Sequence, residues 1–278
     1  MALTRVTSGL SDLVDETSGK EIIVVPTHVD QFTSIRTKYE PFLNMGFKEQ
    51  HTFASSVTEV FSPVDINLFL QSTSQYEGHG NYTMATGRFI SLLIQNSFNS
   101  GHNNFVLDVQ NLKPLDCLGS ELVGYKKNQL RLTTIGDVGC DCGMLVNHVQ
   151  LTFPSVLDRC GKYANHSQFI IGTARDACGV EADNSHFTIN TVEDFCGLRA
   201  KRSIFKVARA ESICGSYAYK STFVIGSGSG ECGEQAERCV FKTSNNDQFS
   251  RFKQYVSQGH GNKLYLMKID GSEEEVLL

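Results

Sequence analysis

Short runs of alternating apolar and variable residues recur every 18 residues through the second half of the chain. Six units align on a Cys-Gly pair, with the cysteine taken as position 1, at Cys142, Cys160, Cys178, Cys196, Cys214 and Cys232. Positions 8, 10 and 12 carry mostly serine, phenylalanine and aliphatic side chains, whereas positions 9 and 11 vary. A period of two is typical of a half-buried strand, so each unit is predicted to contain one β-strand.

The repeat as a whole predicts one coil of a β-solenoid. Eighteen residues would also make five turns of α-helix, but glycine stands at position 2 of every unit and β-branched and aromatic residues gather at positions 9–12, which disfavours a helix. Coils stack about 4.8 Å apart, so equal positions form columns. We expect the cysteines to be buried free thiols, the glycines to turn a corner, and the core to rest on Phe169, Phe187, Phe205, Phe223 and Phe241.

The flanking segments do not repeat. Residues 124–141 are interpreted as a degenerate leading coil, with Ile135-Gly136 aligned to Ile171-Gly172, so that the solenoid spans 124–249. Residues 21–123 are predicted to form a smaller, mostly-β domain, and 250–278 a C-terminal cap with a hairpin at Asp270-Gly271. The predicted fold class is therefore mainly all-β.

Within 21–123 three segments support this prediction. Residues 21–25 read as a strand, and two apolar runs at 88–98 and 104–112 are joined by Asn-Ser-Gly-His-Asn, a hairpin pattern. The segment 32–47 is mixed and would allow a short helix interrupted by Pro41.

Composition excludes several classes of protein. The net charge is −5, which gives no electrostatic case for binding nucleic acid or an anionic membrane. There is no apolar run long enough to insert into a membrane, and the first twenty residues lack the apolar region of a secretory signal. No Cys-x-x-Cys occurs among the nine cysteines, so a zinc ribbon is not expected and no cofactor is predicted.

Two motifs suggest enzymes. Gly228, Gly230 and Gly233 fit a dinucleotide fingerprint, but they precede another repeat unit rather than a helix. The order His28, Asp65, Cys142, with Cys142 followed by glycine, resembles chymotrypsin-like viral cysteine proteases and implies a thiolate–imidazole pair. However, the same Cys-Gly pair recurs five more times, as a structural column requires and a nucleophile does not.

Outward positions offer further candidates. His148 and His166 occupy position 7 and His186 position 9, which favours surface residues over a metal site. The tyrosines at outward positions, which would be free to face a glycan, are Tyr163, Tyr217 and Tyr219.

The pattern G-x-x-A-x-x-S-x-F-V-I-G-x-x-S at 215–229 resembles glycine-punctuated repeats of bacteriophage tail fibres, tailspikes and trimeric bacterial adhesins. The opening MALTRVTSGL is similar to the N-terminal segment of phage tail fibre proteins. The 18-residue Cys-Gly period is unlike the adhesin head repeats, which leaves the shape and handedness of the coil open.

The resemblance implies a non-enzymatic virion protein, assembled in the bacterial host cytoplasm. It would be a homotrimer whose residues 1–20 attach to other tail or capsid proteins and whose rigid shaft faces a host surface glycan. The alternative it allows is a polysaccharide depolymerase, which needs paired carboxylates. Glu181 and Asp183 share a unit, with Glu193 and Asp194 nearby, but no pair stands out.

Overall fold

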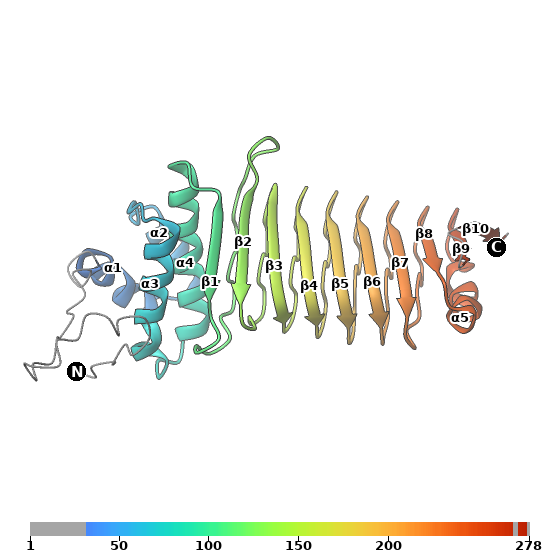
Figure 1. Cartoon of the computed structure of the whole chain (residues 1–278), viewed down its shortest axis with the longest axis horizontal. Helices are drawn as coiled ribbons and strands as arrows, with labels where there is room; N and C mark the ends of the chain where they lie inside the picture. The colour runs from blue at the N-terminus through green and yellow to red at the C-terminus, as the bar shows by residue number, and fades with distance from the viewer. Residues whose placement is uncertain (1–31, 269–271, 277–278) are drawn as a thin grey trace, which may run out of the picture.

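The strands form a single ten-stranded sheet in chain order (Figure 1). The computed structural model describes residues 32–268 and 272–276. The strands are β1 (Asn104–Asp108), β2 (Leu130–Ile135), β3 (Val149–Val156), β4 (Gln168–Ala174), β5 (His186–Val192), β6 (Ile204–Ala210), β7 (Thr222–Ser227), β8 (Val240–Thr243), β9 (Lys263–Met267) and β10 (Glu273–Val276). Neighbouring strands are parallel from β1 to β9, and β10 returns antiparallel to β9.

The register between strands equals the sequence period. Phe169 lies opposite Phe187, and Phe187 opposite Phe205, each 18 residues further along. Smaller bridges repeat the same step outside the strands, such as Cys196 to Cys214. The predicted parallel β-solenoid of about six turns is thereby confirmed.

The phenylalanine column is a stack of parallel rings. Successive ring centroids from Phe169 to Phe241 lie 4.6, 4.7, 4.9 and 5.2 Å apart, with interplanar angles of 9° or less. Each ring is at most 1% exposed. Because the ladder spacing is about 4.8 Å, the backbone itself sets the ring separation.

The glycine at position 2 makes room for these rings. All six have φ between 63° and 82°, a left-handed conformation that costs other residues energy. A Cβ at Gly197 would also lie 2.6 Å from Cε1 of Phe223. The glycine column therefore serves both the corner and the core.

Two further corners of each coil were not predicted. Positions 4 and 7 are also left-handed, but they hold ordinary residues: Tyr163 has φ 58° and His166 has φ 48°. Since neither position carries a preferred residue type, the sequence does not reveal them. A fourth inward column at position 15 was also missed, and its buried members are Val156, Ala174, Val192 and Ala210.

The leading coil differs from its predicted alignment. Ile135 is 44% exposed and Ile171 only 2%, so the two are not equivalent. Instead, Leu118-Gly119 takes the place of Cys-Gly, because Gly143 N–H donates to Leu118 O as Gly161 N–H donates to Cys142 O. The coil is lengthened by a tight turn in which Tyr125 and Asn128 exchange backbone hydrogen bonds, and this insertion shifts the alignment.

The mostly-β prediction for 21–123 is wrong for its described part. Before β1 the chain is helical, and the elements are α1 (Thr33–Asn44, containing Pro41), α2 (Phe47–Ala54), α3 (Pro63–Ser72), the 3₁₀ helix η2 (Thr73–Tyr76) and α4 (Tyr82–Asn99). The run at 88–98 lies in α4, where the buried apolar residues Phe89, Ile90, Leu93, Ile94 and Phe98 follow a helical rather than a two-residue spacing. The predicted hairpin of 88–98 with 104–112 is thus a helix followed by β1, and the predicted strand at 21–25 lies outside the described residues.

The helices cap the first coil with side-chain amides. Gln95 of α4 accepts a hydrogen bond from Val123 N–H (2.8 Å) and donates one to Val123 O (3.1 Å). Asn67 of α3 accepts from Asp108 N–H (2.9 Å), and Ser91 of α4 accepts from Gly119 N–H (2.8 Å). These side chains satisfy backbone N–H and C=O groups that would otherwise need a preceding coil as their partner. The helices and solenoid also share one continuous apolar core.

The other end is capped in the same manner. Helix α5 (Asn246–Val256), which was not predicted, buries Phe252 and Val256 against the last coil. Asn262 accepts from Cys239 N–H (2.9 Å) and donates to Ala236 O (2.8 Å). β9 and β10 pair antiparallel, and the Asp270-Gly271 turn of the predicted hairpin lies outside the described residues.

Candidate functional site

The cysteine column is a buried structural feature. All nine cysteines are free thiols, and the six of the column are at most 1% exposed. Burial raises the pKa of Cys160, Cys196 and Cys232 well above the usual value. Hydrogen bonds from Cys196 and Cys232 lower the pKa of Cys214, but all six thiols of the column are shielded from solvent. We therefore expect them to react slowly in the folded protein.

We expect alkylation of the native protein near pH ~8 to modify a single thiol slowly. Cys140 is the partly exposed cysteine, and burial raises the pKa of Cys117 to about 12. Iodoacetamide labelling followed by mass spectrometry should therefore find Cys140 alone modified, and all nine cysteines after denaturation. The Cys140→Ser variant should remain unlabelled; rapid native labelling of a column cysteine would contradict the buried assignment.

The protease interpretation is wrong, because Cys142 lies in a β-solenoid and not in a chymotrypsin-like fold. Cys142 begins a solenoid coil, is fully buried, and donates its thiol hydrogen to Leu115 O (3.3 Å). Asp65 lies in the first turn of α3 and accepts a hydrogen bond from the Ser62 hydroxyl (2.7 Å), in the helix cap. His28 lies outside the described residues. The two described members thus have structural roles.

The dinucleotide fingerprint is also a structural feature. Gly228 follows β7 with φ 123°, and a Cβ there would lie 1.8 Å from Ala210 O. Gly233 is the position-2 glycine of the next coil, and no helix begins at this point. The glycines serve the turn between two coils.

His148, His166 and His186 do not gather at one point. The rings of His148 and His166 lie with centroids 4.9 Å apart and planes tilted by 32°, whereas His186 lies at the start of β5. Within residues 32–268 and 272–276, no three histidine, cysteine or acidic side chains gather in a way that would hold a metal ion. Over the same ranges, no helix is long and apolar enough to cross a bilayer.

The predicted glycan-facing tyrosines fall into two places. Tyr163 (41% exposed) and Tyr217 (48%) both occupy position 4, but three coils separate them, or about 14 Å. Tyr219 shares a coil with Tyr217, and Lys220 Nζ lies 5.1 Å from its ring centroid. Lys220 and, to a smaller extent, Arg238 hold the pKa of Tyr219 below its usual value. Tyr217 and Tyr219 thus lie on one coil, with Lys220 and Arg238 beside Tyr219, whereas Tyr163 lies three coils away.

The acidic residues considered for a depolymerase are engaged elsewhere. Asp183 is paired with Arg202, and Glu181 lies 3.9 Å from Arg199. Glu193 and Asp194 lie at the opposite end of β5 from this pair. The two acidic pairs therefore lie at opposite ends of β5 rather than on either side of one site.

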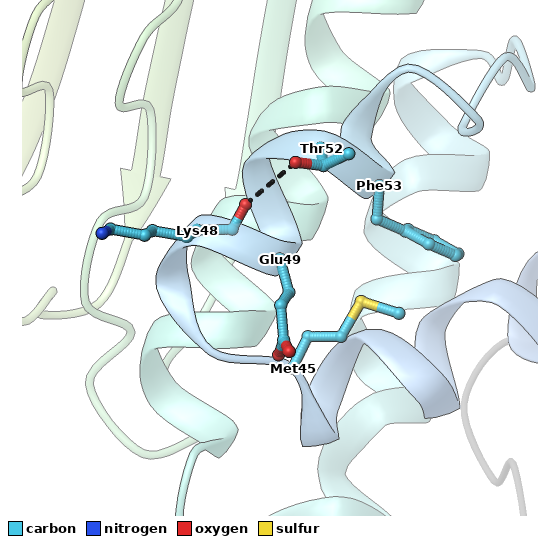
Figure 2. A pocket seen from close by; sticks show the side chains of 5 residues that line it. All are labelled: Met45, Lys48, Glu49, Thr52 and Phe53. Carbon is cyan, nitrogen blue, oxygen red and sulfur yellow. Dashed lines mark hydrogen bonds between the residues drawn. The ribbon is translucent and has the colours of Figure 1, made fainter.

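A pocket of about 540 Å³ lies on the helical region, and Figure 2 shows its lining. Met45 and Phe53 form its apolar wall. The polar groups serve α2 itself: Glu49 accepts from Gly46 N–H (2.8 Å), and the Thr52 hydroxyl donates to Lys48 O (3.2 Å). The Lys48 side chain points away in Figure 2. The hydrogen bonds of its polar groups are thus made within α2 and its cap.

A longer groove of about 660 Å³ crosses the outer face of the sheet. It runs over β3–β7 along two columns, which we call column 11 and column 13 after their positions in the coil. Column 13 consists of Pro154, Gly172, Asn190, Ala208 and Gly226. Its side chains are mostly small, so this column forms the floor of the sheet-face groove. Sequence reasoning missed it because outward positions vary.

No protein-family model, curated protein or solved structure matches this chain.

Proposed function

We propose that this protein is a structural component of a bacteriophage particle, of the tail fibre or tailspike kind, in which the solenoid is a rigid shaft. The observation that carries the proposal is the rod itself: one continuous sheet, parallel from β1 to β9, and one core, capped at both ends by the chain's own residues. A rod that is capped at both ends, and whose described residues form no catalytic cluster, suits a mechanical role. The β-solenoid is also consistent with tailspike-like proteins.

In this proposal the N-terminal region attaches to other tail or capsid proteins, and copies of the chain lie together as a homotrimer. The surface of Tyr217 and Tyr219 is offered to a host glycan. Aromatic faces pack on sugars, and nearby cations suit an acidic one. Several copies on one axis would convert weak contacts into avidity.

Location on the particle tests the proposal. Particles purified from cells that produce the chain should carry it, and antibody-gold labelling in electron micrographs should place it at the tail or at the capsid surface. Recovery of the chain only in the particle-free cytoplasmic fraction would contradict a virion role. Release of reducing sugars from host capsule would instead favour the depolymerase.

A further inference from the structure

Columns 11 and 13 on the outer face of β3–β7 are almost uncharged, whereas the neighbouring position 14 carries Arg209 on β6. Column 11 consists of Thr152, Ile170, Thr188, Lys206 and Val224. Over columns 11 and 13 together, Lys206 is the single ionised side chain of these five strands. The corner positions of the same coils, by contrast, carry ions such as Glu181, Arg199 and Arg202. Uncharged surface of this kind is typical of an interface centre.

Apolar side chains of this face also lie in water. Ile170 is 45% exposed in column 11, and Val106 on β1 is 46% exposed in the same column, through the pairing of Val106 with Thr133 and of Thr133 with Thr152. Exposed apolar residues are common singly. Here they adjoin an apolar groove, which favours a partner that covers both.

The face is complementary to itself in one orientation. Column 11 is a ridge of longer side chains, and column 13 beside it is a floor of small ones. A rotation axis parallel to the rod, whether two-fold or three-fold, brings the ridge of one copy against the floor of the next at the same coil height. An axis perpendicular to the rod would instead bring ridge against ridge.

The area of this face and the capped ends of the rod both favour contact along the flanks. Thr134 of β2 also lines the groove, so the face extends over the six strands β2–β7. Six strands spaced about 4.8 Å apart, with roughly 20 Å of strand each, give about 600 Å² per copy, the lower end of what a specific interface buries per partner. The ends of the rod are closed by Gln95 and Asn67 on one side and Asn262 on the other. These caps disfavour end-to-end stacking and leave the flanks for contact between copies.

We propose that the sheet-face groove is the contact between copies of this chain, packed side by side with their rods parallel. The proposal rests on the proposed function, for which it supplies the surface that holds the copies together. The occupant of the groove is a second copy, whose column 11 lies over column 13 of the first.

Sedimentation velocity of the full chain tests the contact. The wild-type protein should sediment as a multiple of 30.8 kDa, and Ile170→Arg should reduce it to the monomer by placing a charge in the contact. Leu145→Arg is the matched control, because Leu145 is 49% exposed and Ile170 45%, but Leu145 lies at a corner. It should leave the assembly intact, and thermal unfolding by circular dichroism should show both variants folded.

A wild-type monomer would overturn the proposal and leave the groove to another partner. An Ile170→Arg variant that still assembles would also overturn it and move the contact elsewhere. Particle labelling does not depend on Ile170, so a chain that is monomeric in solution yet present on particles would defeat this inference alone.

Cross-linking tests the orientation. In a Cys140→Ser background, a short bis-maleimide should join Thr188→Cys in one copy to Asn190→Cys in another when the two variants are mixed. Joining of Thr188→Cys copies to each other, without the mixed product, would contradict the parallel arrangement.

Discussion

Replacing Phe205 with alanine is expected to lower the free energy of unfolding by about 3–5 kcal/mol. The ring is fully buried between Phe187 at 4.7 Å and Phe223 at 4.9 Å. Its neighbours cannot close the gap, because hydrogen-bonded ladders on both sides fix the coil spacing. The surroundings of Phe205 can therefore relax only a little, and the cost of a cavity is highest at such sites.

Urea unfolding followed by circular dichroism measures this loss. Phe195→Ala is the matched control, since Phe195 belongs to a neighbouring part of the coil but is 36% exposed. It should lower the free energy of unfolding by only about 1–2 kcal/mol, because its ring is partly exposed and leaves no enclosed cavity. Equal effects of the two substitutions would contradict the ring stack as the main source of burial.

Truncation after Ser244 is expected to convert a protein of uniform size into fibrous or aggregated material. The deletion uncovers Phe241, whose coil is closed by Leu264 of β9 and by Val256 of α5. It also leaves a row of unpaired backbone groups along β8, and such an edge recruits other strands. Light scattering and negative-stain electron microscopy would detect the assemblies.

A shorter truncation serves as the control. Removal of residues 269–278 takes away β10 but keeps α5 and the amide of Asn262, which holds Cys239 and Ala236. This chain should keep the size of the full-length protein. If the longer truncation also kept a uniform size, the cap would not be what prevents end-to-end growth.

The sequence predicts this fold well only where the 18-residue repeat is regular. Phe187 and Phe205 occupy equal positions of equal units, so their pairing follows from the period alone. The run at 88–98 has no such repeat. Its high apolar content favours a strand, although the spacing of Phe89, Leu93 and Phe98 is helical. Corners at positions 4 and 7 escaped prediction because residues such as Tyr163 adopt the left-handed conformation without glycine.

The candidate surfaces could be predicted only in part. The sequence identified Tyr217 and Tyr219 as outward-facing, since their coil position followed from the period. It did not identify the sheet-face groove, because a groove depends on the relative size of neighbouring columns, such as Thr188 beside Asn190. Each outward column varies along the rod, so no single unit carries the pattern.

The amide caps have a consequence for how this molecule can change in length. Gln95 fits the first coil and Asn262 the last, whereas every middle coil presents the same backbone to its neighbours. A duplication or loss of one 18-residue unit would therefore alter the rod by about 4.8 Å and leave both termini matched. The number of repeats therefore sets the length of the rod, and evolution can change that length by one coil at a time.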